Sequence, residues 1–140
     1  MAQINSWGKA LLLVKSALEK KALDLVVLEV RDLTSIADYF IVCSGRSDRQ
    51  VQSVAQGVEE TARKAGIRPI SVEGLTRGHW VLMDFSDVIV HIFYEPVRAF
   101  YDLDGLWDHA PRAKLPEPYS TLASQFQITP KRVFQSSTDL

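Results

Sequence analysis

The chain has 140 residues and a formal net charge of −1, with 46% hydrophobic and 24% charged residues. These proportions are typical of one soluble globular domain and exclude a wholly disordered chain, a collagen-like chain and a coiled-coil rod. The balanced charge excludes a protein that binds nucleic acid over its whole surface, because such proteins carry an excess of basic residues.

Cysteine usage and apolar runs indicate the compartment. The single cysteine, Cys43, excludes an intramolecular disulfide and any zinc site that needs two thiolates. Both absences are typical of a reducing compartment. The apolar run 10–14 is too short for a signal peptide, and no stretch approaches the ~20 apolar residues that span a bilayer. We therefore expect a cytoplasmic protein.

The first half of the chain alternates helical and extended patterns. Residues 6–22 place apolar side chains at a spacing near 3.6 and are expected to form a helix. Segments 25–31 and 39–44 are short and rich in β-branched or aromatic residues, so we expect two strands. Ser47 and Gln50 have the form of a capping box, which predicts a helix that ends near Gly66.

The second half contains the remaining predicted strands. A short strand is expected at 70–72, and the segments 80–85 and 88–94 predict an antiparallel hairpin around a tight turn. Pro96 suits the first turn of a helix that runs to about Trp107.

This order of elements predicts an α/β fold with a mixed five-stranded sheet flanked by helices. The strand, helix and strand of 39–72 are expected to form a right-handed crossover between parallel strands. We assign residues 1–110 to the domain. Residues 111–140, which hold four of the six prolines, are assigned to a tail mostly without core contacts.

Charge is concentrated in one part of the chain. Residues 73–108 contain seven acidic and two basic residues, a net charge of −5, and His79 and His91 also lie there. An acidic segment favours a basic partner, or serves solubility alone.

Residues with catalytic or metal-binding chemistry do not form a recognisable set. Cys43 lies in an apolar strand, where a free cysteine normally behaves as a small buried hydrophobe. The spacings of His79, His91 and His109 match no local metal motif. Asp102 and Asp104 are expected on one helix, where side chains two residues apart diverge, so the pair is a poor metal platform. We predict no catalytic site, no metal and no cofactor.

Aromatic residues are more informative. Trp80 begins a strand and Tyr101 lies on the last predicted helix, close to acidic residues. Such side chains are enriched in protein interfaces, but they also fill cores, and the pattern leaves both interpretations open. For Phe93 and Phe100 we expect the core.

Four segments closely resemble the ribosomal silencing factor family, also called the Iojap family. They read DYFIVCSGRSDRQVQSVAQGVEE, VEG, GHWVLMDFSDVIVHIF and RAFYDLDGLW, within a similarity that runs from about Ala17 to Trp107. The resemblance implies a mixed sheet related to nucleotidyltransferases, without known catalysis. It implies binding to the large ribosomal subunit through ribosomal protein L-fourteen, which blocks joining of the small subunit, and a homodimer in the free state.

Carried over by motif, Trp80 and Tyr101 correspond to the main partner contacts. We add their neighbours His79 and Arg98, and the acidic residues Glu73, Asp84 and Asp102, to the candidate contact set. Basic residues of the tail (Arg112, Lys114, Lys131 and Arg132) are candidates for contact with ribosomal RNA or are simply solvated. Plastid relatives carry a transit peptide, which we do not find in this chain, so we expect a bacterial cytoplasm.

Two rival functions remain. A nucleotidyltransferase-like enzyme would hold a nucleotide near Gly45–Arg49, but the carboxylate pair expected about ten residues later is replaced by a predicted helix. An adaptor for a different partner is the other alternative.

Overall fold

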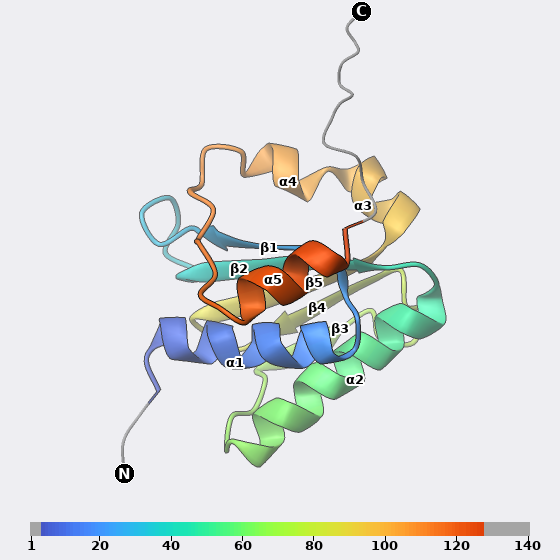
Figure 1. Ribbon diagram of the computed structural model, residues 1–140, viewed down its shortest axis with the longest axis horizontal. Coiled ribbons are helices and arrows are strands. Elements are labelled where there is room, and N and C mark those ends of the chain that lie inside the picture. Colours follow the sequence, from blue (N-terminus) through green and yellow to red (C-terminus); the bar gives the residue numbers. More distant parts are fainter. Residues whose placement is uncertain (1–3, 128–140) are drawn as a thin grey trace, which may run out of the picture.

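The computed structural model describes residues 4–127, which form a five-stranded sheet with helices on both of its faces (Figure 1). The elements are, in chain order, α1 (Ser6–Glu19), β1 (Leu23–Glu29), β2 (Tyr39–Gly45), α2 (Asp48–Lys64), β3 (Ser71–Glu73), β4 (Trp80–Asp84), β5 (Val88–Tyr94), α3 (Glu95–Tyr101), α4 (Leu103–Leu106) and α5 (Tyr119–Gln125). The predicted mixed five-stranded α/β sheet is confirmed. The expected relation to nucleotidyltransferases stays a prediction. Within residues 4–127, no helix is both long and apolar enough to cross a bilayer.

The strands follow the order β1-β2-β5-β4-β3. β2 and β5 are parallel, and the other neighbouring pairs are antiparallel. The predicted hairpin of β4 and β5 is confirmed, with Trp80 opposite Phe93 and Asp84 opposite Ile89. β3 runs parallel to β2, as expected for the crossover through α2, but β5 and β4 lie between them.

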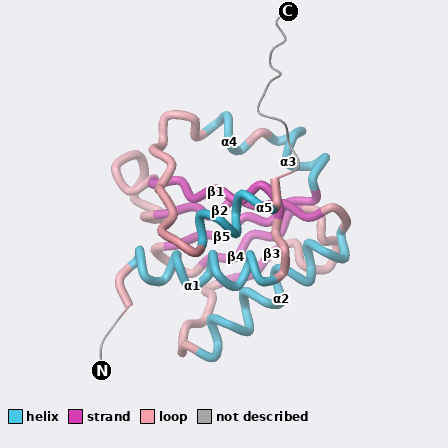
Figure 2. The backbone as a smooth tube through the Cα atoms, in the orientation of Figure 1, coloured by secondary structure: helices cyan, strands magenta, loops and turns pink. Residues whose placement is uncertain are grey.

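Alternating strand residues divide the core between the two sheet faces. On the first face, side chains such as Ile41, Val90 and Met83 pack under α1, α2 and α5. On the second face, Phe40 and Phe93 pack under α3, α4 and the segment that follows. The tube in Figure 2 shows the strands as a central layer with helices around it. Trp80 and Leu82 of β4 are only half-buried on the second face, so this part of the sheet is incompletely covered.

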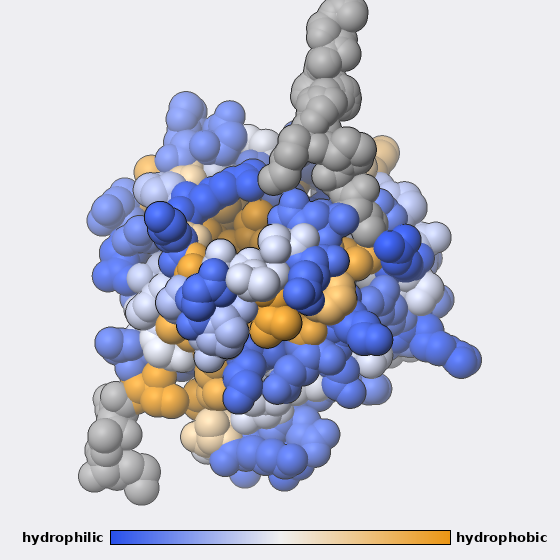
Figure 3. All heavy atoms as spheres, in the orientation of Figure 1, coloured by the Kyte–Doolittle hydropathy of each residue, from blue (hydrophilic) through white to orange (hydrophobic). Residues whose placement is uncertain are grey.

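Helix α2 begins where the capping pattern predicts. Ser47 is its N-cap, and the Ser47 hydroxyl accepts a hydrogen bond of 3.1 Å from the amide of Gln50. The Gln50 side chain accepts one from the amide of Arg46, one residue before the cap. Val51, Val54 and Val58 are buried, so the predicted apolar stripe faces the core. The opposite, solvent-facing side belongs to the hydrophilic surface that dominates Figure 3.

The prediction of one helix from Pro96 to Trp107 is wrong. The helix breaks at Asp102, which adopts a left-handed backbone conformation with φ 50° and then caps α4 by accepting a hydrogen bond of 3.1 Å from the amide of Gly105. A Cβ atom at residue 105 would collide with the Asp102 carboxylate, so the corner favours glycine there. Asp102 and Asp104 therefore do not share one helix.

The prediction of a tail mostly without core contacts is wrong for residues 111–127. Leu28 of β1 forms a bridge with Arg112, the amide of Ala113 donates to the Val27 carbonyl at 2.8 Å, and Ala123 of α5 is buried in the first-face core. This segment satisfies backbone groups along the edge of β1, which would otherwise be an unpaired sheet edge. Lys131 and Arg132, predicted as candidates for RNA contact, lie outside the described residues.

Candidate functional site

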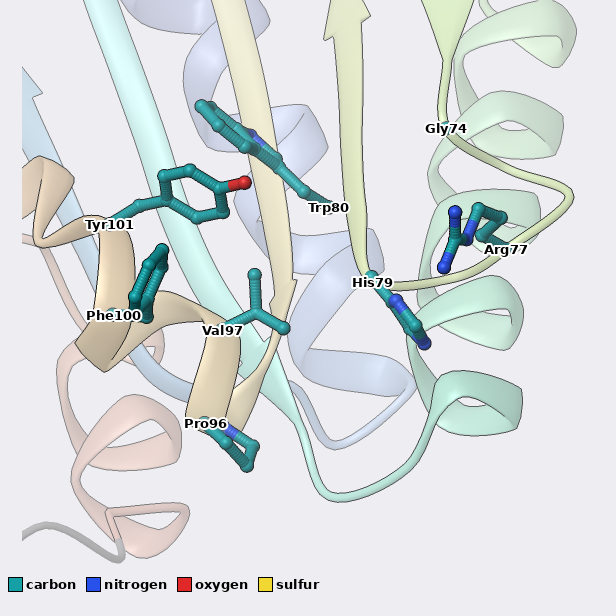
Figure 4. Close-up of a pocket in the computed structure, with 8 residues that line it drawn as sticks. All are labelled: Gly74, Arg77, His79, Trp80, Pro96, Val97, Phe100 and Tyr101. Atoms are coloured by element: carbon teal, nitrogen blue, oxygen red, sulfur yellow. The ribbon is translucent and has the colours of Figure 1, made fainter.

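A groove of about 470 Å³ lies on the incompletely covered part of the second sheet face (Figure 4). One wall is helix α3, and the other is the loop before β4 together with the start of that strand. The lining residues are Pro96, Val97, Phe100 and Tyr101 on α3, and Gly74, Arg77, His79 and Trp80 on the opposite side. The structure thus brings together Trp80, Tyr101 and His79 from the predicted contact set.

Trp80 is held by residues of β5. Its ring stacks on Phe93 with centroids 4.9 Å apart, and its Nε1–H donates a hydrogen bond of 3.2 Å to Nδ1 of His91. His91 is 5% exposed, and burial lowers its pKa to about 4 against a weaker opposing effect of Asp104. His91 is therefore neutral at physiological pH, and its Nδ1 is free to accept the indole proton.

Tyr101 and Phe100 extend the aromatic surface from α3. The Tyr101 ring lies 5.0 Å from that of Trp80 between centroids, and Phe100 meets Tyr101 edge-on at 5.1 Å and 86°. Tyr101 is 55% exposed and Phe100 is 80% exposed. The expectation that Phe100 fills the core is wrong, whereas Phe93 is fully buried as expected. The sequence did contain a signal for this shared surface. Val97, Phe100 and Tyr101 are spaced i, i+3 and i+4, and residues at that spacing share one helix face.

The loop before β4 is fastened to α2. The side-chain amide of Gln52 donates to the carbonyls of Leu75 and Thr76, at 3.0 and 2.9 Å. Gly74 has φ 84°, and a Cβ atom there would collide with the Trp80 carbonyl oxygen. Only glycine therefore permits this close approach of the loop to β4. His79 follows this loop, with its ring centroid 6.0 Å from that of Tyr94.

None of the predicted acidic contacts lines the groove. Asp102 follows Tyr101 directly and is exposed. Glu73 lies on β3 opposite Leu82, on the same sheet face as Trp80. Asp84 ends β4, about 13 Å from Trp80 for a rise of ~3.3 Å per residue, and its carboxylate accepts a hydrogen bond from the amide of Ser86.

Arg98, also predicted as a partner contact, does not line the groove. Its side chain is 14% exposed and forms a salt bridge of 2.8 Å with Asp104. Burial raises the pKa of Asp104, but the hydrogen bonds and charge of Arg98 outweigh that effect and lower the pKa overall.

Within residues 4–127, the cysteine and the histidines are not assembled into a catalytic arrangement. Cys43 is fully buried, and burial raises its pKa to about 12 against a smaller opposing effect of Arg98. His109 is exposed near Asp108, and His79 and His91 belong to the groove and its floor. Among the residues that the structure describes, no cluster of three or more His, Cys, Asp or Glu side chains could hold a metal ion.

Comparisons with known proteins place this geometry in a family. The profile described as "Ribosomal silencing factor during starvation" matches residues 3–139. The ribosomal silencing factor of Bacillus subtilis is 40% identical over 97 residues, which cover 69% of this chain and 82% of that protein. Its counterpart from Halalkalibacterium halodurans is 39% identical over 104 residues, with 74% and 89% coverage.

A solved structure agrees with these matches. The crystal structure of a protein from Chromobacterium violaceum superposes with a TM-score of 0.74 and 32% sequence identity. The superposition covers 81% of this chain and 92% of that one. With a profile that spans nearly the whole chain and relatives near 40% identity, the chain belongs to the ribosomal silencing factor family.

Proposed function

We propose that this protein binds the large ribosomal subunit through ribosomal protein L-fourteen and represses translation by blocking the small subunit from joining. Membership of the ribosomal silencing factor family supports ribosome-associated regulation of translation. The observation that carries the docking site is the contact between Trp80 and Tyr101, two aromatic side chains that line an open groove from separate elements.

The composition of the groove fits a protein partner. Binding energy at protein interfaces is concentrated in a few aromatic and arginine side chains near the centre, surrounded by a polar rim. Here Trp80, Phe100 and Tyr101 supply the apolar centre. Glu73 and Asp102, next in sequence to the lining residues Gly74 and Tyr101, supply negative charge beside it, which favours a basic protein surface over the phosphates of RNA.

The arrangement supports a binding role without catalysis. The only cysteine is buried with a raised pKa. Asp104 is engaged by Arg98, and Asp102 caps α4. A general base or nucleophile needs a partner within hydrogen-bond reach at an accessible site, and none of these residues meets that condition. We also propose that the free chain forms homodimers, because Phe100 in the groove and Leu106 outside it expose apolar surface, at 80% and 74% exposure.

Co-sedimentation tests the proposed function. In a sucrose gradient with both subunits dissociated, we expect the protein in the large-subunit fractions and absent from the small-subunit fractions. Tyr101→Ala should strongly reduce this recovery, whereas Ile36→Ala, which truncates an exposed apolar side chain outside the groove, should not. Recovery of the parent protein only at the top of the gradient would overturn the proposal.

A second assay addresses the mechanism. Purified small subunits are added to large subunits with or without the protein, and the yield of joined ribosomes is measured by light scattering. We expect the parent protein to lower that yield and Tyr101→Ala to leave it unchanged. Binding to large subunits with undiminished joining would refute the steric block while leaving the docking site intact.

A further inference from the structure

Helix α3, which forms one wall of the groove, buries too little surface to fix its own orientation. α3 has seven residues, and none of its side chains is fully buried. Isolated helices shorter than about 12–15 residues are marginal in water and depend on tertiary contacts. Val97 packs partly into the second-face core, but Phe100 and Tyr101 point to solvent and the groove. The orientation of this wall therefore needs another source.

The guanidinium of Arg98 ties α3 to three other parts of the fold. Its Nε and Nη2 donate to the two carboxylate oxygens of Asp104, at 3.1 and 2.8 Å. Its Nη1 donates to the hydroxyl of Ser44 at 2.9 Å and to the carbonyl of Asp24 at 2.8 Å. These partners lie at the start of α4, at the end of β2 and in β1, so one side chain links the helix to the sheet and to the next helix.

This linkage is well shielded from water. The side chains of Arg98 and Asp104 are 14% and 23% exposed, and Ser44 is buried. Hydrogen bonds between charged groups in such surroundings are stronger than exposed ones, and a bidentate pair also fixes direction. A lysine cannot replace the planar fork of donors that reaches three partners at once.

We propose that Arg98 is a positioning residue of the groove, which sets the angle of α3 and thereby places Tyr101 and Phe100 against Trp80. Arg98 lies one turn before Tyr101 on α3, and every α3 residue that lines the groove lies within three positions of it. Arg98 acts through these neighbours and not by touching the partner. The binding experiment that tests this inference rests on the proposed function, because it measures binding to large ribosomal subunits.

The first test needs no ribosome. The protein is labelled with 5-fluorotryptophan, and the fluorine resonances of Trp7, Trp80 and Trp107 are assigned by single Trp→Phe substitutions. We expect Arg98→Ala and Arg98→Lys to shift or broaden the Trp80 resonance, because Tyr101 no longer covers it. The Trp7 resonance should stay in place, since Trp7 packs against Tyr39 on the other sheet face.

The control variant for this test is Arg63→Ala. Arg63 is exposed at the end of α2 and makes only a weak ion pair of 3.9 Å with Glu60. It should leave all three resonances unchanged. An Arg98→Ala spectrum identical to that of the parent protein would overturn the positioning role.

The second test is a double-mutant cycle on binding to large subunits. We expect Arg98→Ala and Arg98→Lys each to weaken binding by about tenfold or more, and Arg98→Ala to add less than about threefold in a Tyr101→Ala background. Independent losses that multiply would mean that Arg98 touches the partner directly, and would overturn the inference. Near-parental binding of Arg98→Lys would also overturn it, because charge alone would then suffice.

The two tests separate this inference from the function it rests on. Absence of parental binding to large subunits, together with a shifted Trp80 resonance in Arg98→Ala, refutes the proposed function and supports the positioning role. Should Arg98→Ala unfold, as measured by circular dichroism, Ser44→Ala serves as a milder variant. It removes one of the four hydrogen bonds and should shift the same resonance to a smaller extent.

Discussion

His91 of β5 holds the indole of Trp80 through a hydrogen bond of 3.2 Å from the indole Nε1 to Nδ1. The two residues are diagonal neighbours across the β4–β5 pair, since Trp80 lies opposite Phe93 and Leu82 opposite His91. Because Nδ1 accepts this bond, the imidazole carries its proton on Nε2. A buried neutral histidine therefore fixes the ring plane of the aromatic residue that lines the groove.

This relationship predicts a specific pH dependence of stability. Burial lowers the pKa of His91 from 6.5 to about 4. As the pH falls below 6.5, the unfolded chain takes up a proton on His91 that the folded chain does not. The free energy of unfolding therefore decreases between pH 6.5 and 4, and this loss stays constant below pH 4. Its full size is on the order of 3 kcal/mol. Above pH 6.5 the titration of His91 does not change the stability of the fold.

Thermal melts of the parent protein and His91→Phe, from pH 7.5 to 4, check this prediction. The melting temperature of the parent protein should fall over the acidic range by several degrees more than that of His91→Phe, which lacks the titrating group. Parallel curves for the two proteins would show that His91 remains solvated and protonates normally. The comparison cancels the titration of carboxylates that do not interact with His91, because both proteins share them.

A second prediction concerns the segment after residue 110. Ala123 of α5 is 7% exposed and belongs to the first-face core, whereas Gln125 of the same helix is exposed. Ala123→Arg should destabilise the fold by roughly 2 kcal/mol or more, because a charge cannot be buried there without a partner. Gln125→Arg should change stability by less than about 0.5 kcal/mol. Urea denaturation followed by circular dichroism measures both, and equal midpoints would mean that α5 does not dock.

Local sequence patterns predicted most of the sheet and helix α2. β-Branched runs marked strands that the structure confirms to within about two residues, and the Ser47 cap marked the start of α2. The family resemblance assigned Trp80 and Tyr101 to one contact set, but the sequence did not predict that their rings meet, because the two residues lie on separate elements. The strands and helix α2 depend on local periodicity and capping, which a single sequence displays.

The features that sequence reasoning missed depend on long-range contacts. The break of the last helix at Asp102 is stabilised by Gly105 and by the pairing of Arg98 with Asp104. Only the folded structure reveals that this pair also reaches Ser44. The docking of residues 111–113 on β1 joins segments more than 80 positions apart. Proline, serine and threonine content indicated a tail mostly without core contacts, because composition does not report the unpaired edge that the segment covers.

The third prediction separates binding from folding at Tyr101. Its side chain is 55% exposed and makes aromatic contacts with Trp80 and Phe100. Tyr101→Ala should therefore lower the melting temperature by only a few degrees, while truncation of a central aromatic anchor costs about 2 kcal/mol of binding, roughly a 30-fold loss of affinity. Calorimetry and quantitative pelleting with large subunits measure the two effects. A large drop in melting temperature would assign Tyr101 to the core instead.

The last prediction concerns Phe100, the most exposed aromatic side chain of the groove. Phe100 is 80% exposed, and its ring lies nearly perpendicular to that of Tyr101. Its truncation to alanine should leave the melting temperature within a few degrees of the parent value, because little buried surface is lost. Binding to large subunits should weaken by roughly tenfold, since a partner seated on Tyr101 also covers this ring. Leu106→Ala is the matched control, because Leu106 is 74% exposed on the neighbouring helix α4 but does not line the groove. Equal affinities of Phe100→Ala and the parent protein in the same pelleting assay would confine the docking site to the Trp80 side of the groove.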